Sequence, residues 1–201
     1  MTPSHHLPDE LLLAYAAGAL EEAEALLVAS HASLCPRCAK KVEELERMGG
    51  ALLSSSQPDP VSDDLLARTL AMLDAVPRAL PPEPVRDPVL PAPLARLTGP
   101  FDQIAWSQSL ANTETLELAL QLGGVPVRLR RFQPGTRIPK HTHRAPEFDL
   151  ILTGGVTDDR DGRHFVRGDV SANDERDAHS LTIDLGEPCV ALSVHAARVR
   201  P

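Results

Sequence analysis

The stretch GTRIPKHTHRAPEFDLILTG, residues 135–154, places three potential metal ligands within seven residues: His141, His143 and Glu147. Side chains of a strand alternate between its two faces, so the two histidines are expected to point the same way. Glu147 has the same parity and can join them if the chain bends only mildly. Two imidazoles and a carboxylate suit a divalent transition metal. The remaining ligand has to come from another strand, and His179 is the candidate.

The sequence on either side of this stretch alternates apolar and polar residues with a period of two. Segments such as EFDLILTGG, RHFVRGDVS and SLTIDLG are short, and Gly, Asp and Pro separate them. This pattern predicts an antiparallel sandwich or barrel of about 100 residues. The leucines expected on one face of TLELALQL are Leu116, Leu118, Leu120 and Leu122, and Val125 belongs to the next segment.

The spacing G-x5-H-x-H-x3-E-x6-G in the same stretch resembles the first cupin motif at every defined position. The second cupin motif is matched by Gly168-Asp169-Val170 and by His179, although the proline and glycine that usually precede this histidine are absent. Zinc, iron, manganese or nickel could each bind such ligands, and the sequence does not choose among them. The resemblance implies a metal site inside a small β-barrel, formed by His141, His143, Glu147 and His179.

Other interpretations of these residues stay open. The three-ligand cluster could be a set of ordinary polar residues on an exposed strand, although its coincidence with framing glycines favours a metal. His164 and His195 fall outside the pattern and are expected to be surface or packing histidines. Cys189 is expected to be a small buried apolar residue. A redox role is the alternative, and the lack of an evident neighbour that would lower its pKa counts against it.

Residues 1–76 are rich in Leu, Ala and Glu, which lose little on entering a helix. Ser62 or Asp63 is expected to cap the last helix of this part. Gly18 falls near the end of the first helix, and Gly49-Gly50 near the end of the third. Four helices are expected, near residues 9–18, 21–33, 36–50 and 62–76.

A small helical domain with Tyr15 as its one aromatic residue gains only about 3–5 kcal/mol of folding free energy from its core. An additional stabilising cross-link, such as a bound metal ion, is therefore expected. His31, Cys35 and Cys38 form H-x3-C-x2-C, and with His6 they make a Cys2His2 set suited to tetrahedral zinc. The competing interpretation of Cys-Pro-Arg-Cys is a dithiol redox motif, but the expected helices on both sides favour zinc. Spacing alone does not separate His5 from His6.

Residues 77–100 contain eight prolines and are expected to form an extended, semi-rigid spacer between two cores. The alternative for the last of these residues is a structured loop packed on the second domain. The predicted organisation is therefore α+β with two domains: a four-helix zinc-binding domain over 1–76, a linker over 77–100, and an antiparallel β-barrel over 101–201.

The charge distribution excludes some partners. The net charge is −8, and residues 1–90 carry −7 of it, so binding of nucleic acid through phosphate contacts is not expected. An acidic helical domain instead suits a basic protein partner. No signal peptide or transmembrane run is visible, and two of the three cysteines lie in a CxxC motif. These features favour the cytoplasm and argue against a membrane partner.

The zinc pattern at an acidic helical N-terminus, followed by a cupin-like domain, is similar to the layout of ChrR-type anti-sigma factors. The resemblance also runs through HH...LLxAYAAGxL and HxxLC. It implies that the helical domain sequesters an extracytoplasmic-function sigma factor, in an expected 1:1 complex. It further implies that the cupin domain triggers release in response to singlet oxygen or organic peroxides, and that the protein is not an enzyme. The zinc ligands it implies are His6, His31, Cys35 and Cys38.

The fourth helix carries an apolar stripe that is expected to contact the sigma factor, and packing of this stripe on its own domain is the alternative. The stripe consists of Leu65, Leu66, Thr69, Leu70 and Leu73.

A rival function is that of a cupin dioxygenase or isomerase with an accessory zinc domain. The acidic helices and the scarcity of aromatic residues for a substrate pocket count against this enzyme function.

Overall fold

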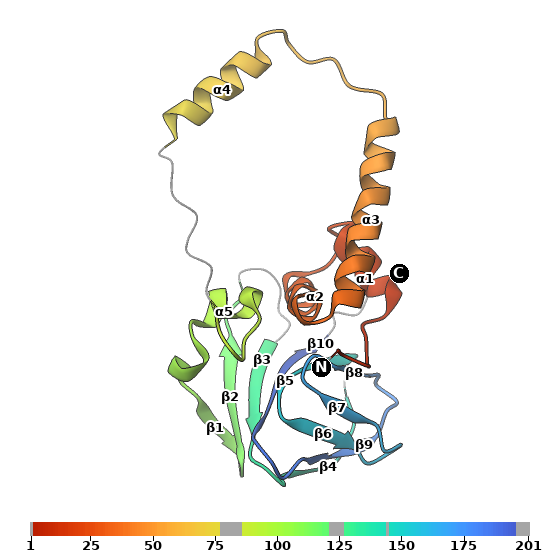
Figure 1. The fold of residues 1–201 in the computed structure, drawn as a ribbon, viewed down its shortest axis with the longest axis vertical. Helices are drawn as coiled ribbons and strands as arrows, with labels where there is room; N and C mark the ends of the chain where they lie inside the picture. The colour runs from red at the N-terminus through yellow and green to blue at the C-terminus, as the bar shows by residue number, and fades with distance from the viewer. Residues whose placement is uncertain (1, 77–85, 121–126, 144, 196–201) are drawn as a thin grey trace.

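The computed structural model describes residues 2–76, 86–120, 127–143 and 145–195, which form a helical part and two antiparallel sheets (Figure 1). The prolines at 77, 81, 82 and 84, the turn at 123–124, and Leu122 and Val125 lie outside the described residues. The helices are α1 (Asp9–Ala16), α2 (Glu22–Leu34), α3 (Pro36–Ser55), α4 (Leu65–Ala75) and α5 (Ala92–Thr98), followed by a 3-10 turn, η1 (Phe101–Gln103).

The first three helices begin and end where the sequence provides a local reason. Acidic residues occupy the first turns of α1 and α2, where the helix dipole favours them. Gly18 follows α1 with φ +67°, a conformation that ends helices and that glycine adopts without strain. Pro36 occupies the first turn of α3, where its missing N–H group leaves no hydrogen bond unmade.

Two predicted helix boundaries are wrong. α3 runs through Gly49 and Gly50 and ends at Ser55, because neither glycine adopts the left-handed conformation that would stop it. A glycine costs a helix only about 1 kcal/mol relative to alanine, which the surrounding leucines and alanine tolerate. α4 begins at Leu65 without a side-chain cap from Ser62 or Asp63.

The strands form two antiparallel sheets, which confirms the predicted class of a helical N-terminal part followed by an antiparallel β-domain. One sheet has the order β1-β2-β3-β10-β5-β8, and the other has the order β4-β9-β6-β7. The strands are β1 (Ser107–Leu110), β2 (Thr113–Leu118), β3 (Val127–Phe132), β4 (Arg137–His141), β5 (Glu147–Thr153), β6 (Gly155–Asp158), β7 (His164–Val166), β8 (Val170–Asn173), β9 (His179–Ile183) and β10 (Cys189–His195).

One expected strand is in fact two. The segment RHFVRGDVS forms β7 and β8, which are separated by a turn at Gly168 with φ +91°. β7 pairs with β6 in the smaller sheet, whereas β8 pairs with β5 in the larger one. The turn at Gly168 therefore carries the chain from one sheet to the other.

The central strands of the six-stranded sheet, β3, β10 and β5, are buried on both faces, whereas β1 is exposed. Leu129, Leu150 and Leu192 are fully buried on the outer face of the sheet and belong to one apolar cluster with Leu27 of α2 and Leu94 of α5. The opposite face contributes a second cluster against the smaller sheet, made of Phe132, Ile151, Val156, Phe165, Ile183, Cys189 and Ala191. The helical part and the β-domain therefore share a continuous core.

The predicted linker is not an extended spacer along its whole length. Residues 92–98 form α5, with Leu94 and Ala95 buried in the shared core. Pro91 and Pro93 stand at the start of this helix, where proline is tolerated. Asp87 accepts hydrogen bonds from the N–H groups of Val89, Leu90 and Phe101, which fixes the chain on both sides of α5. The division into independent domains stays a prediction.

α4 lies apart from both the other helices and the sheets (Figure 1). Its apolar side chains are exposed, with Leu66 at 69% and Leu73 at 63%, so packing of this stripe on its own domain is wrong. α3 also exposes large apolar side chains along its second half, including Leu52 and Leu53. Among the described residues, no helix has the length and apolar composition needed to cross a membrane.

Candidate metal centres

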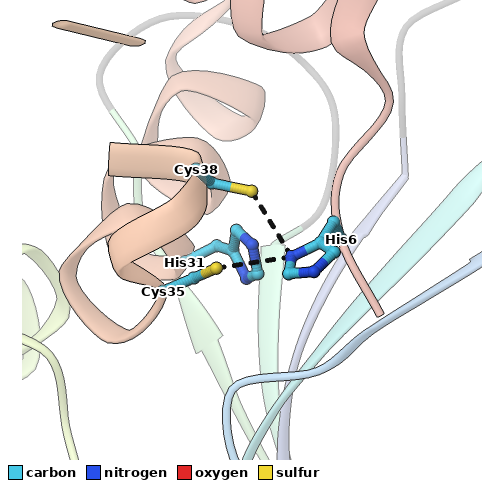
Figure 2. A group of neighbouring side chains, drawn as sticks. All are labelled: His6, His31, Cys35 and Cys38. Atoms are coloured by element: carbon cyan, nitrogen blue, oxygen red, sulfur yellow. Dashed lines mark hydrogen bonds between the residues drawn. The ribbon is translucent and has the colours of Figure 1, made fainter. Parts of the chain in front are cut away.

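The N-terminal cluster brings together all four residues predicted to bind zinc. Their potential ligand atoms lie within 4.8 Å of one another, and Figure 2 shows both thiols directed at the ring of His6. The Sγ atoms of Cys35 and Cys38 lie 3.3 Å and 3.6 Å from Nδ1 of His6. Cys35 is extended between α2 and α3, and Cys38 lies one turn into α3, so both thiols reach the same side.

A buried nitrogen without a partner indicates that these residues fit a metal ion. Nδ1 of His31 donates a hydrogen bond to the carbonyl oxygen of Gly168, at 2.9 Å, which leaves the lone pair on Nε2. This Nε2 atom is buried and has no hydrogen-bond partner in the described part of the chain. Beside two thiols and a second imidazole, it completes a tetrahedral set of two sulfur and two nitrogen donors, which suits zinc.

Burial adjusts the charge of the donors. It lowers the pKa of His31 to about 4, so this imidazole is neutral, as a ligand must be. Burial and the neighbouring Cys35 raise the pKa of the Cys38 thiol to about 11. A cation bound between the thiols would reverse that preference, because metal ligation requires the thiolate.

The structure separates His5 from His6. The His6 ring belongs to the cluster, whereas the His5 ring packs on Phe165 of β7 with 4.5 Å between ring centroids. Spacing left this choice open because the two histidines are adjacent. The extended chain before α1 turns them to opposite sides, one toward the helices and one toward the β-domain.

The second cluster consists of three histidines at one edge of the β-domain. The ligand atoms of His141, His143 and His179 lie within 4.8 Å of one another. His141 and His143 do not share a strand as predicted, because His141 ends β4 and His143 lies in the following loop. His179 opens β9 and so comes from another strand, as expected. Pairing of β4 with β9 places His141 opposite His179, and the loop brings His143 to both.

Each of these rings has an acceptor at Nδ1, which leaves the Nε2 lone pair free. His141 donates to the carbonyl oxygen of Pro139 at 2.9 Å, His179 donates to Asp158 at 3.0 Å, and His143 donates to Glu147. The Nε2 atoms of His143 and His179 are 3.0 Å apart. Two nitrogen lone pairs so close repel unless a proton or cation lies between them, so the histidines fit a metal.

Glu147 is placed differently from the expectation that it shares a strand face with the histidines. It opens β5 in the other sheet, and its Oε2 atom accepts from His143. Its Oε1 atom is 3.4 Å from Arg130 and 3.5 Å from His195. Direct ligation by Glu147 stays a prediction. His195, expected to be a surface or packing histidine, is in fact a neighbour of this carboxylate.

Sequence reasoning missed two acidic residues beside this cluster, the buried Asp158 and the half-buried Asp149. Asp158 is fully buried and orients His179 from 21 residues away, and no local pattern could have indicated that contact. Asp149 follows Glu147 by two residues on the same strand face, and that parity was a usable signal. Burial, and then the charge of Glu147, raises the pKa of Asp149 to about 6, and Ser193 donates to it.

A cavity of about 1170 Å³ adjoins the three-histidine cluster. His141, His179 and Glu147 line it together with apolar side chains from both sheets, including Phe132 and Phe165. Cys189 also lines it, but burial, followed by the charge of Asp149, raises the pKa of this thiol to about 12. The default expectation of a buried, unreactive cysteine therefore agrees with the structure. His164, which pairs with Asp184, is a surface residue as expected.

Known proteins similar to this chain include an anti-sigma factor. No family model matches the chain. It is 35% identical over 202 residues to the anti-sigma-E factor ChrR of Cereibacter sphaeroides, covering 100% of this chain and 93% of that protein.

Two solved structures are also similar. The crystal structure of Rhodobacter sphaeroides SigE in complex with the anti-sigma ChrR matches with a TM-score of 0.84 and 33% identity, over 96% of this chain and 99% of that chain. KdgF from Halomonas sp. matches with a TM-score of 0.42 and 16% identity, over 49% of this chain and 93% of that chain.

Proposed function

This chain belongs to the family of the anti-sigma-E factor ChrR, and we propose that it sequesters an extracytoplasmic-function sigma factor in a 1:1 complex. The helical part, held by zinc at His6, His31, Cys35 and Cys38, grips the sigma factor. The cupin domain releases it after sensing singlet oxygen or an organic peroxide. Sigma factors act on RNA polymerase, so we expect the chain in the cytoplasm.

The observation that carries this proposal is the unpartnered apolar surface of two helices. Leu66 and Leu70 of α4 and Met48, Leu52 and Leu53 of α3 are between 52% and 76% exposed. Large apolar side chains exposed on two successive helices mark a protein interaction site, because water exposure of so many is unfavourable. The acidic residues around them suit a basic partner.

The predicted contact set fits this surface with one extension. Leu65, Leu66, Thr69, Leu70 and Leu73 all lie on α4 and are exposed. The exposed side chains on the second half of α3 were not predicted, because the glycines were expected to end that helix. We propose that α3 and α4 bind opposite sides of one sigma-factor segment.

The sensor role draws support from the three-histidine cluster and its cavity. His141 and His179 border a space large enough for a small molecule. A divalent ion held by the histidines would supply a Lewis-acidic or redox-active centre there. The chain's own groups fix the imidazoles through Asp158, Glu147 and the Pro139 carbonyl.

The experiment mixes the purified full-length chain with an extracytoplasmic-function sigma factor from the same genome. Native mass spectrometry should report a 1:1 complex, and transcription from a cognate promoter should stop until singlet oxygen or an organic peroxide is supplied. Failure to bind any such sigma factor, together with turnover of a small organic acid or diketone by the iron-loaded protein, would overturn the proposal.

A further inference from the structure

The turn between β7 and β8 connects the cupin domain to the N-terminal metal cluster. Asp169 of this turn is fully buried, and its carboxylate accepts hydrogen bonds from the backbone N–H groups of Ser4, at 2.6 Å, and His5, at 2.9 Å. The N–H group of Val170 donates in turn to the carbonyl oxygen of His5, at 3.2 Å. The segment directly before His6 is therefore bound to the β-domain.

The same turn also holds a second member of the cluster. The carbonyl oxygen of Gly168 accepts from Nδ1 of His31, which fixes the ring and leaves Nε2 for the metal. Gly168 has φ +91°, and a Cβ atom at this position would lie 2.7 Å from the ring of Pro3. Glycine is therefore required both for the turn and for the close approach of the N-terminal segment.

We propose that Asp169 and the Gly168 carbonyl group are positioning groups of the N-terminal zinc site, so that the cupin domain holds two of its four ligands. One ligand, His31, is held directly through its ring. The other, His6, is held through the two residues that precede it. Such outer partners fix the orientation and tautomer of metal-bound histidines.

The two strands that flank the turn line the barrel cavity, so a change in the cavity could reach the N-terminal cluster through the turn. Phe165 and Ser171, on the two strands that flank the turn, line the cavity. The ring of His5 packs on Phe165 with 4.5 Å between centroids. A change in the cavity that moves β7 or β8 would therefore displace the groups that hold His6 and His31. This consequence for release rests on the proposed function, whereas the positioning role does not.

The test measures the rate at which zinc passes from the purified full-length chain to a coloured chelator. Asp169→Asn should release zinc about 10- to 100-fold faster than the unaltered chain, the range typical for loss of an outer partner. The metal of the barrel should remain bound in the same sample. Asp161→Asn, an exposed residue of the β6–β7 turn, is the matched control and should release zinc at the original rate.

Gly168→Ala provides a second variant, because it keeps the carboxylate but disturbs the turn and the N-terminal segment. It should also accelerate zinc release, and amide hydrogen exchange should increase at Ser4 and His5 in both variants. An unchanged zinc release rate in either variant would overturn the proposal, as would equal loss of both metals. Neither measurement requires a sigma factor, so failure here is distinct from failure of sigma binding.

Discussion

The two metal-binding clusters differ in how complete their donor sets are and in what surrounds them. The N-terminal cluster offers two thiols and two imidazoles, which fill a tetrahedral coordination shell. The barrel cluster offers three imidazoles and borders a cavity of about 1170 Å³. A closed shell suits a structural ion, whereas an incomplete shell beside a cavity leaves room for a small molecule. This contrast supports the proposal that the N-terminal site is structural and that the barrel site is the sensor.

The largest effect is expected at the closed site. Cys38→Ser should abolish zinc binding and sigma-factor binding, because a structural zinc in a small domain contributes on the order of 10 kcal/mol. Metal analysis of the full-length chain measures the first loss, and native mass spectrometry with the sigma factor measures the second. Cys189→Ala removes a thiol of the barrel and should leave zinc and sigma binding intact. Sigma binding by a zinc-free Cys38→Ser protein would show that the site is not structural.

The open site should behave in the opposite way. His141→Ala should remove the barrel metal and the response to inducer, while sigma binding and zinc content stay unchanged, because His141 does not support the shared core. A reporter gene under the sigma factor measures the response. His164→Ala, on the barrel surface, is the control. A full response in His141→Ala would remove the distinction between the two sites.

The separate roles of the two sites also require that the helices, and not the barrel, bind the sigma factor. Leu66→Ala should weaken sigma binding by about 10- to 100-fold, as expected for a central interface residue. Folding should not change, since Leu66 is 69% exposed. Calorimetric titration gives the affinity, with the exposed residue Gln57, changed to Ala, as the control. An unaltered affinity would place the contact elsewhere.

Much of the closed site could be predicted from the sequence, because its ligands lie close together along the chain. H-x3-C-x2-C places His31 in the last turn of α2 and Cys38 in the first turn of α3, and the extended Cys35 between them completes the group. The residues that hold the ligands could not be predicted. Asp169 reaches the backbone of Ser4 from 165 residues away, and such pairs leave no periodic signal.

The core shared by the helices and the sheets could have been predicted from two apolar strands, but the many prolines of residues 77–100 pointed to separate domains. Leu150-Ile151-Leu152 and Val190-Ala191-Leu192 are continuous apolar runs, which are typical of strands buried on both faces. Because the outer face of the six-stranded sheet is apolar, it has to be shielded from water, and α2 and α5 pack against it. The many prolines suggested a spacer, but two of them stand where a helix begins.

A smaller effect tests the continuity of that core. Asp87→Asn should lower the free energy of unfolding by about 1.5–3 kcal/mol, because the amide has no charge and keeps only one of the two oxygens that accept hydrogen bonds. Burial opposes ionisation of Asp87, but hydrogen bonds from Leu90, Phe101 and Val89 outweigh it and lower its pKa.

The pH dependence of that effect has a defined sign. A lowered pKa stabilises the fold above the unfolded value and loses this effect as pH falls through the folded value. The difference between Asp87→Asn and the unaltered chain should therefore shrink in acid, as measured by urea unfolding at several pH values. Asp102→Asn, on the nearby surface, should show neither effect. A pH-independent difference would contradict a role for the ionised carboxylate.

The smallest effect concerns the third cysteine. Because the pKa of Cys189 is raised to about 12, its thiol should resist alkylation at pH 8 in the folded chain. Cys35 and Cys38 should react once a chelator removes zinc, because loss of a structural ion opens the small helical part and ends the burial that raises the pKa of Cys38 to about 11. Mass spectrometry of the adducts distinguishes two modified cysteines from three. Alkylation of Cys189 in the folded protein would reopen a redox role for the barrel.

The most direct test of the central claim is the metal content of the purified full-length chain. Elemental mass spectrometry should find two ions per chain, one of them zinc. The count should fall to one in Cys38→Ser, which keeps the barrel metal, and to one in His141→Ala, which keeps the zinc. A single ion in the unaltered chain, or loss of both ions from either variant, would contradict the existence of two sites with separate roles.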